Sequence, residues 1–147
     1  MSMNEDRARG LHSERGFTLV ELLVVMLILG LLAAIAIPAF FAQRDKARDA
    51  SAKSSARTAA TAIETFGTDH DGSYGGVAVA DLEAIEATLA AADLTVVAAN
   101  ADGYEISSGS STGNAFNIER RADGTTGFTC TTPSEGGCPP SGSWADG

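Results

Sequence analysis

Residues 16–42 read GFTLVELLVVMLILGLLAAIAIPAFFA and contain a single charged side chain, that of Glu21. After it, from Leu22 to Ala42, there are 21 residues without a charge. A helix of that length rises about 30 Å, which is the thickness of the hydrocarbon core of a bilayer. We therefore expect residues 16–42 to form a helix that can span a membrane.

Glu21 is the unusual residue of this apolar segment. On insertion scales, a carboxylate costs about 2.5–3.5 kcal/mol at the bilayer centre, so such a residue is expected to have a function and a positively charged partner. The alternative is that Glu21 lies at the membrane interface, where water hydrates the carboxylate and no special role is needed.

The residues around Glu21 resemble a known processing site. Gly16-Phe17-Thr18-Leu19-Val20-Glu21-Leu22 is similar to the cleavage site of type IV prepilins and type II secretion pseudopilins. This resemblance implies that a prepilin peptidase removes residues 1–16 as a leader, cutting after Gly16, and N-methylates Phe17. It also implies that Glu21 supports assembly by pairing with the freed amine of Phe17 of a neighbouring subunit in an apolar filament core, where attraction between charges is strong.

Gly30 and Pro38 stand where these families often carry helix-weakening residues. Within a helix, Gly costs about 1 kcal/mol relative to Ala, and Pro removes a backbone donor and clashes one turn back. The helix is therefore expected to bend or melt between residues 30 and 38. An ordinary transmembrane helix that tolerates both residues is the alternative.

A secretory signal peptide is a second interpretation of the N-terminal region. Basic residues precede the apolar segment, and Ala34-Ile35-Ala36 resembles a small-residue cleavage site. Glu21 and the helical pattern that continues beyond Ala36 argue against it. Since basic residues flank the segment on both sides, a cytoplasmic N-terminus rests on the family resemblance alone.

The helical pattern continues after the apolar segment, over residues 39–66. One face of this helix carries apolar residues at alternating spacings of four and three: Ala52, Ala56, Ala59, Ile63 and Phe66. Gly67 suits a helix C-terminus, so we predict one helix of roughly 50 residues that ends there.

The remaining residues predict a small head of α+β class. Residues 81–92 have the pattern of a short helix capped by Asp81. Four short strands are predicted at residues 94–99, 104–108, 115–121 and 125–131. An antiparallel sheet packed on the long helix would give the αβ roll of the pilins that this chain resembles. The expected organisation is a leader (1–16), a transmembrane or filament-core half-helix (17–42), an amphipathic half-helix (43–66) and a head (67–147).

Charge is distributed unevenly along the chain. Residues 44–57 carry five basic and two acidic side chains, whereas residues 64–147 carry two basic and thirteen acidic ones. A positive neck of one subunit is therefore able to meet the negative head of another, although exposed ion pairs contribute only about 0–1 kcal/mol each. Direct nucleic-acid binding by the head is not expected, because it requires clustered Lys or Arg.

Cys130 and Cys138 are the only cysteines of the chain. An exported head predicts a disulfide between them, worth about 2–3 kcal/mol in the chain-entropy model. No His or further Cys lies nearby in the sequence, so no metal site is predicted. Residues 69–73 resemble the start of a calcium loop, but Tyr74 and Ala80 stand where that loop requires Gly and Glu, so a turn is expected.

The sequence shows no catalytic constellation, so we predict a structural protein without enzymatic activity or a cofactor. The resemblance implies a type IV pilus subunit that is a single-pass cytoplasmic membrane protein before assembly and part of an extracellular, homo-oligomeric helical filament afterwards. An assembly ATPase and an inner-membrane platform protein are the implied partners. The alternatives are a pseudopilin of a type II secretion or DNA-uptake system, a membrane-anchored extracytoplasmic binding domain and an exported soluble enzyme.

Overall fold

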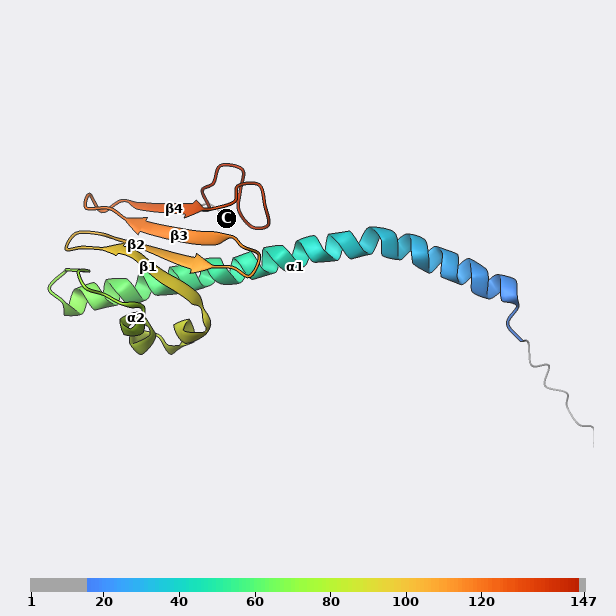
Figure 1. The fold of residues 1–147 in the computed structure, drawn as a ribbon, viewed down its shortest axis with the longest axis horizontal. Coiled ribbons are helices and arrows are strands. Elements are labelled where there is room, and N and C mark those ends of the chain that lie inside the picture. The colour runs from blue at the N-terminus through green and yellow to red at the C-terminus, as the bar shows by residue number, and fades with distance from the viewer. Residues whose placement is uncertain (1–15, 146–147) are drawn as a thin grey trace, which may run out of the picture. The chain divides into compact units, whose positions relative to one another are not determined.

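The computed structural model describes residues 16–145, so the predicted leader lies outside the described residues except for Gly16. The structure confirms the α+β class, with a long N-terminal helix followed by a small sheet (Figure 1). In chain order the elements are α1 (Leu19–Asp69), α2 (Val79–Ile85), the 3-10 helix η1 (Ala87–Ala91), β1 (Asp93–Ala99), β2 (Tyr104–Gly109), β3 (Ala115–Arg120) and β4 (Thr126–Cys130).

The chain divides into two compact units, with the boundary between Pro38 and Ala39. We call residues 16–38 the N-terminal segment and residues 39–145 the head unit. Helix α1 is unbroken through Gly30 and Pro38, so of the two expectations, bending or melting, melting is not seen in the single chain. A proline removes one backbone hydrogen bond, and the apolar residues on both sides retain the helix.

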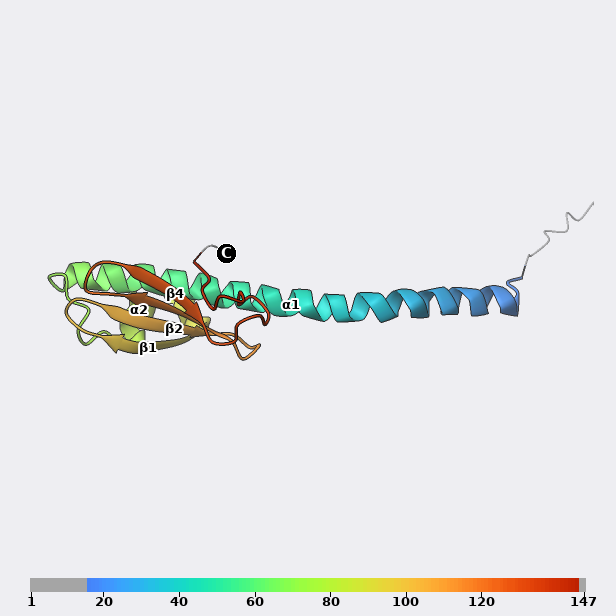
Figure 2. The same cartoon turned by 90° about the horizontal axis from the view of Figure 1, so that it is seen from above.

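The head unit contains a four-stranded antiparallel sheet in the order β1-β2-β3-β4. The predicted strands are confirmed, with ends that differ by one residue at most. Figures 1 and 2 show this sheet lying along the second half of α1. Tyr104 is paired with Arg120 and Phe116 with Cys130, which fixes the face of the sheet that carries the core residues.

The predicted apolar stripe of α1 is the buried face of the head unit. All five of its residues are buried in a core that also contains Ile106, Phe116 and Ile118 of the sheet. Three of the five are alanines, whose small side chains allow the helix and the sheet to approach closely.

Trp144, the only tryptophan of the chain, closes the same core from the C-terminal segment. Its ring lies edge-to-face against Phe116 and Phe128, with centroids 5.8 and 5.1 Å away, and its indole Nε1 donates to the Thr129 carbonyl at 2.8 Å. Such ring pairs stabilise a core beyond the area they bury, so Trp144 ties the C-terminal segment to the sheet.

The end of α1 differs from the prediction. The helix continues to Asp69, and Gly67 is buried inside it. A Cβ atom at Gly67 would lie 2.7 Å from the Tyr74 ring, so this glycine permits close packing and does not end the helix. The predicted turn follows instead, where Asp71 and Gly72 have positive φ angles of 55° and 85°.

The prediction of one helix over residues 81–92 is wrong. The chain forms α2 and η1, separated at Glu86, whose backbone is extended. The Glu86 carboxylate accepts a hydrogen bond from Thr88 N and so caps the second piece. Asp81 lies within the first turn of α2 and accepts from Ala78 N at 2.8 Å, so it is not the N-cap residue.

Candidate assembly site

The N-terminal segment exposes apolar side chains on all sides of α1. Phe17 is 81% exposed and Ile35 is 75% exposed. By length and composition, α1 is able to span a membrane. An exposed apolar surface of this extent requires lipid or other apolar helices around it.

Thr18 and Glu21 form a reciprocal cap at the start of α1. The Glu21 carboxylate accepts from Thr18 N at 2.9 Å and from Thr18 Oγ1 at 3.1 Å, while Thr18 Oγ1 accepts from Glu21 N at 3.1 Å. This is a capping box, which satisfies backbone N–H groups that have no partner within the helix. The sequence interpretation overlooked Thr18, although the Thr-x-x-Glu spacing is the usual signal for this motif.

The structure brings three of the predicted site residues together at one helix end. Gly16 and Phe17 lie just before α1, separated from it by Thr18, and Glu21 lies in its first turn. The capping box holds the Glu21 carboxylate at this end while leaving the residue exposed. This arrangement holds a carboxylate at the exposed end of an apolar helix. The structure places Gly30 and Pro38 farther along α1, away from this end.

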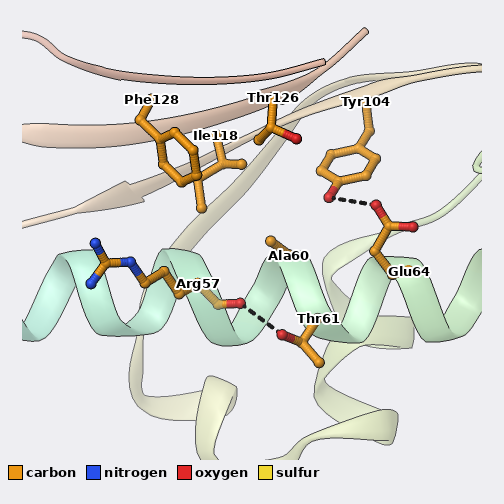
Figure 3. Close-up of a pocket in the computed structure, with 8 residues that line it drawn as sticks. All are labelled: Arg57, Ala60, Thr61, Glu64, Tyr104, Ile118, Thr126 and Phe128. Atoms are coloured by element: carbon orange, nitrogen blue, oxygen red, sulfur yellow. Dashed lines mark hydrogen bonds between the residues drawn. The ribbon is translucent and has the colours of Figure 1, made fainter. Parts of the chain in front are cut away.

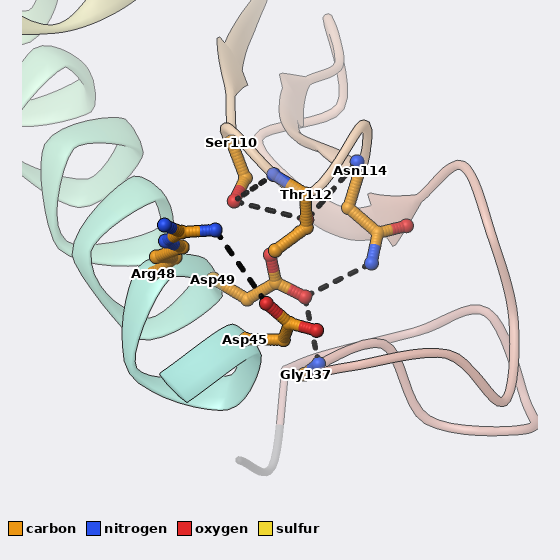
Figure 4. Close-up of polar contacts among 7 residues, drawn as sticks. All are labelled: Asp45, Arg48, Asp49, Ser110, Thr112, Asn114 and Gly137. Carbon is orange, nitrogen blue, oxygen red and sulfur yellow. Dashed lines mark hydrogen bonds and ion pairs between the residues drawn. The ribbon is translucent and has the colours of Figure 1, made fainter. Parts of the chain in front are cut away.

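A second polar centre, missed by the sequence interpretation, lies in the head unit. Asp49 on α1 is completely buried. Its carboxylate accepts from Thr112 Oγ1 at 2.5 Å, from Asn114 Nδ2 at 2.9 Å and from Gly137 N at 2.7 Å (Figure 4). These donors come from the β2–β3 loop and from the loop closed by the Cys130–Cys138 disulfide, which confirms the predicted bridge. Asp49 therefore fastens two loops to the helix.

The environment of Asp49 predicts a particular response to acid. Burial favours the neutral carboxyl, but the hydrogen bonds from Gly137, Ser110, Thr112 and Asn114 outweigh it and hold the pKa of Asp49 below its ordinary value. A lowered pKa in the folded state means that the ionised group contributes stability above the unfolded pKa, about 3.9, and loses it as pH falls through the lower folded value.

We expect Asp49→Asn to make the free energy of unfolding less dependent on pH in the acid range. The free energy of unfolding of the wild-type chain should fall between about pH 4 and pH 2, and that of the variant should fall less, because the amide does not titrate in this range. Urea unfolding of the full chain in detergent, at a series of pH values, measures the difference. An equal decrease in the free energy of unfolding of the two proteins over this pH range would contradict this account of Asp49.

A cavity of about 420 Å³ lies between α1 and the β3–β4 side of the sheet. Figure 3 shows Glu64 and Tyr104 at one end of it and Arg57 at the other. The Glu64 carboxylate accepts from Tyr104 Oη at 3.1 Å and from Tyr74 Oη at 2.8 Å, and it forms an ion pair with Arg120 at 3.1 Å. Burial, with the nearby Glu64 charge, raises the pKa of Tyr104, so this phenol remains a donor. Glu64 thus connects α1 to the loop that carries Tyr74 and to strands β2 and β3.

Comparison with known proteins agrees with the N-terminal geometry. Residues 11–37 match the family model described as the prokaryotic N-terminal methylation motif. The chain is 42% identical over 57 residues to the type IV major pilin protein PilA of Myxococcus xanthus, and 37% identical over 59 residues to the type II secretion system core protein G of Pseudomonas aeruginosa. The N-terminal part of the chain is therefore similar to type IV pilins and to type II secretion pseudopilins.

The similarity to these pilins and pseudopilins varies in extent. The aligned regions cover 39% and 40% of this chain, and 26% and 42% of PilA and core protein G, respectively. A longer alignment, 29% identical over 106 residues, links the chain to the type IV wide pilus major component PilA4 of Thermus thermophilus and covers 72% of this chain and 81% of that protein. No solved structure matches the chain with significance.

Proposed function

We propose that this chain is a structural subunit of a type IV pilus. The observation that supports the proposal is the exposed apolar segment of α1, whose first turn carries the capped Glu21 carboxylate within the motif Gly16–Leu22. The 106-residue alignment with a wide-pilus component adds support, because it extends far beyond the 27 residues of the methylation motif.

In the proposed assembly route, prepilin peptidase cuts after Gly16 and methylates the new amine of Phe17. The monomer waits in the cytoplasmic membrane, held there by residues 17–42. Assembly then moves this half-helix from lipid into a filament core, where the Phe17 amine of one subunit neutralises Glu21 of its neighbour. The low dielectric constant of that core strengthens the attraction and penalises an unpaired charge.

The capping box prepares Glu21 for this pairing. The hydrogen bonds from Thr18 lock the Glu21 carboxylate near the helix end, which reduces the conformational freedom lost when the amine arrives. The extraction of an apolar helix from lipid requires work that this chain does not provide. An assembly ATPase and an inner-membrane platform protein are therefore part of the proposal.

A pseudopilin of a type II secretion or DNA-uptake system is the second candidate. It is favoured by the 37% identity to core protein G and by a 30% identity over 60 residues to the competence protein ComGC of Halalkalibacterium halodurans. The proposed N-terminal chemistry is the same in both cases, so the length and location of the filament distinguish the two functions.

Immunogold electron microscopy of cells that make the chain, with antibodies against the head unit, separates these functions. A pilus subunit should label long surface filaments along their whole length and should be abundant in the fraction sheared from cells. A pseudopilin should remain in the cell-envelope fraction. Labelling of the membrane alone, without any filament, would contradict both.

A further inference from the structure

The two ends of the head unit carry different charged groups. We call one the Asp49 end, which comprises Asp49, the β2–β3 loop (110–114) and the disulfide loop (131–140). The hydrogen bonds of Asp49 to Thr112, Asn114 and Gly137 bring these parts together. The only two lysines of the chain, Lys46 and Lys53, lie on α1 at this end.

These lysines line a cavity of about 590 Å³ beside the disulfide loop. Its other lining residues are Ser134, Gly136, Gly137, Cys138, Pro139 and Pro140. Lys46 is exposed, and Lys53 is partly buried with its Nζ 5.4 Å from the centre of the Phe116 ring. The nearby acids of α1 are already engaged, since Asp45 pairs with Arg48 at 3.6 Å and Asp49 accepts three hydrogen bonds. Glu135 is the acidic residue of the disulfide loop.

The opposite end, which we call the Glu64 end, is acidic. It contains Asp69, the last residue of α1, Asp71 in the turn that follows, and Asp102 in the β1–β2 loop. Tyr74 N donates to the Asn100 carbonyl at 3.1 Å, so these two turns are neighbours, as Figure 1 also shows. All three aspartates are exposed.

The basic residues at the Glu64 end are held by other acids. Arg120 pairs with Glu64 at 3.1 Å and Arg121 with Glu119 at 2.7 Å. The head unit thus presents aspartates at one end and two lysines beside a cavity at the other. Surfaces of opposite sign attract each other and orient an encounter.

We propose that the Lys46 and Lys53 cavity receives the Asp69–Asp71 turn and the Asp102 loop of a second copy of this chain. The two surfaces lie at different ends of one unit, so the contact is head-to-tail and is able to repeat from copy to copy along a filament. This inference rests on the proposed filament function and specifies a contact between heads within it. The main effect of this contact is to set the register and orientation of neighbouring heads, because exposed charge pairs add little affinity.

Zero-length carbodiimide cross-linking of sheared filaments tests the contact. This reagent joins amines to carboxylates that touch, and Lys46 and Lys53 provide the only lysine amines. Intermolecular links produce a ladder of dimers and higher species on a denaturing gel, whereas links within one chain leave monomers. Mass spectrometry of the dimer band should identify Lys46 or Lys53 joined to Asp69, Asp71 or Asp102.

Three variants provide the controls. Lys46→Arg with Lys53→Arg retains both positive charges and should remove the lysine-to-aspartate links from the dimer band while filaments remain. Lys46→Glu should reduce the filament yield at least about fivefold, since like charges then oppose each other, and Asp102→Lys in the same chain should restore much of it. Glu83→Lys on α2, which makes the same change in charge as Asp102→Lys outside the two proposed contact surfaces, should not restore it.

The outcomes separate this inference from the function on which it rests. Filaments that contain the chain but show no lysine link to these aspartates would overturn the head-to-tail contact and leave the pilus proposal intact. Failure of Asp102→Lys to restore Lys46→Glu would also count against the contact. Absence of the chain from any filament would overturn the proposed function itself.

Discussion

Glu21→Gln is expected to remove the chain from surface filaments while leaving it in the membrane with a folded head. The amide still accepts a hydrogen bond from Thr18 N, so the cap of α1 is largely retained. The charge is lost, and the amine of a neighbouring Phe17 is left unpaired in an apolar core, at a cost of about 3–5 kcal/mol. Assembly should therefore fall by more than about 100-fold. Immunoblots of sheared and membrane fractions measure the ratio.

Thr18→Ala is the matched control for Glu21→Gln. It removes the two hydrogen bonds of the Thr18 hydroxyl but keeps the carboxylate and its hydrogen bond from the backbone N of residue 18, and loss of such a side-chain cap costs about 1 kcal/mol. We expect a modest decrease in filaments with this variant. If Thr18→Ala prevents assembly as completely as Glu21→Gln does, Glu21 acts through the helix cap and the charge-pair account is wrong.

Asp49→Ala is expected to produce the largest loss of stability in the head unit. The substitution leaves the donors of Asn114, which is buried, and of Thr112 and Gly137, which are partly buried, without their acceptor, which should lower the free energy of unfolding by about 3 kcal/mol or more. Trp144 is completely buried and is the only tryptophan, so its fluorescence reports on unfolding of the head. Urea titration of the full chain in detergent measures the change.

Asp45→Ala, one helical turn earlier, is the control for Asp49→Ala. Asp45 is partly exposed and pairs with Arg48 at 3.6 Å, so its removal should cost less than about 0.5 kcal/mol. Equal effects of the two substitutions would show that Asp49 does not hold the β2–β3 and disulfide loops on α1. A small effect of Asp49→Ala would show the same.

Much of the fold was predictable because its signals are local. The spacing of Ala52, Ala56, Ala59, Ile63 and Phe66 identified the buried face of α1 directly, and all five are buried. Turn residues between short apolar runs located four strands to within one residue. Antiparallel neighbours joined by short loops pair in sequence order, so the topology followed from the strand positions.

The errors arose where tertiary packing decides the backbone. Leu82 and Leu89 share the apolar face of the predicted helix over residues 81–92, and both are buried. In the structure, Leu82 lies on α2 and Leu89 on η1, and the two short helices are separated at Glu86, whose backbone is extended. The sequence predicts a helix end at Gly67, because a glycine is common there. The close contact of Gly67 with the Tyr74 ring is a feature of tertiary packing and leaves no local signal.

The two polar centres differ in how far the sequence reveals them. Thr18 and Glu21 are three residues apart, so the capping box is readable from spacing alone. Asp49 lies three residues before Ala52 on the apolar stripe, which marks it as a buried acid. Its partners are 63, 65 and 88 residues away in the chain, and no local pattern connects them.

The central claim is that the chain is cut after Gly16 and assembled through the helix that follows. Mass spectrometry of the N-terminal peptide, on protein sheared from the cell surface, tests it most directly. We expect the first residue to be Phe17, carrying a methyl group on its amine. An N-terminus at Ile37, or an uncut Met1 found in membranes alone, would contradict the claim and with it the filament function.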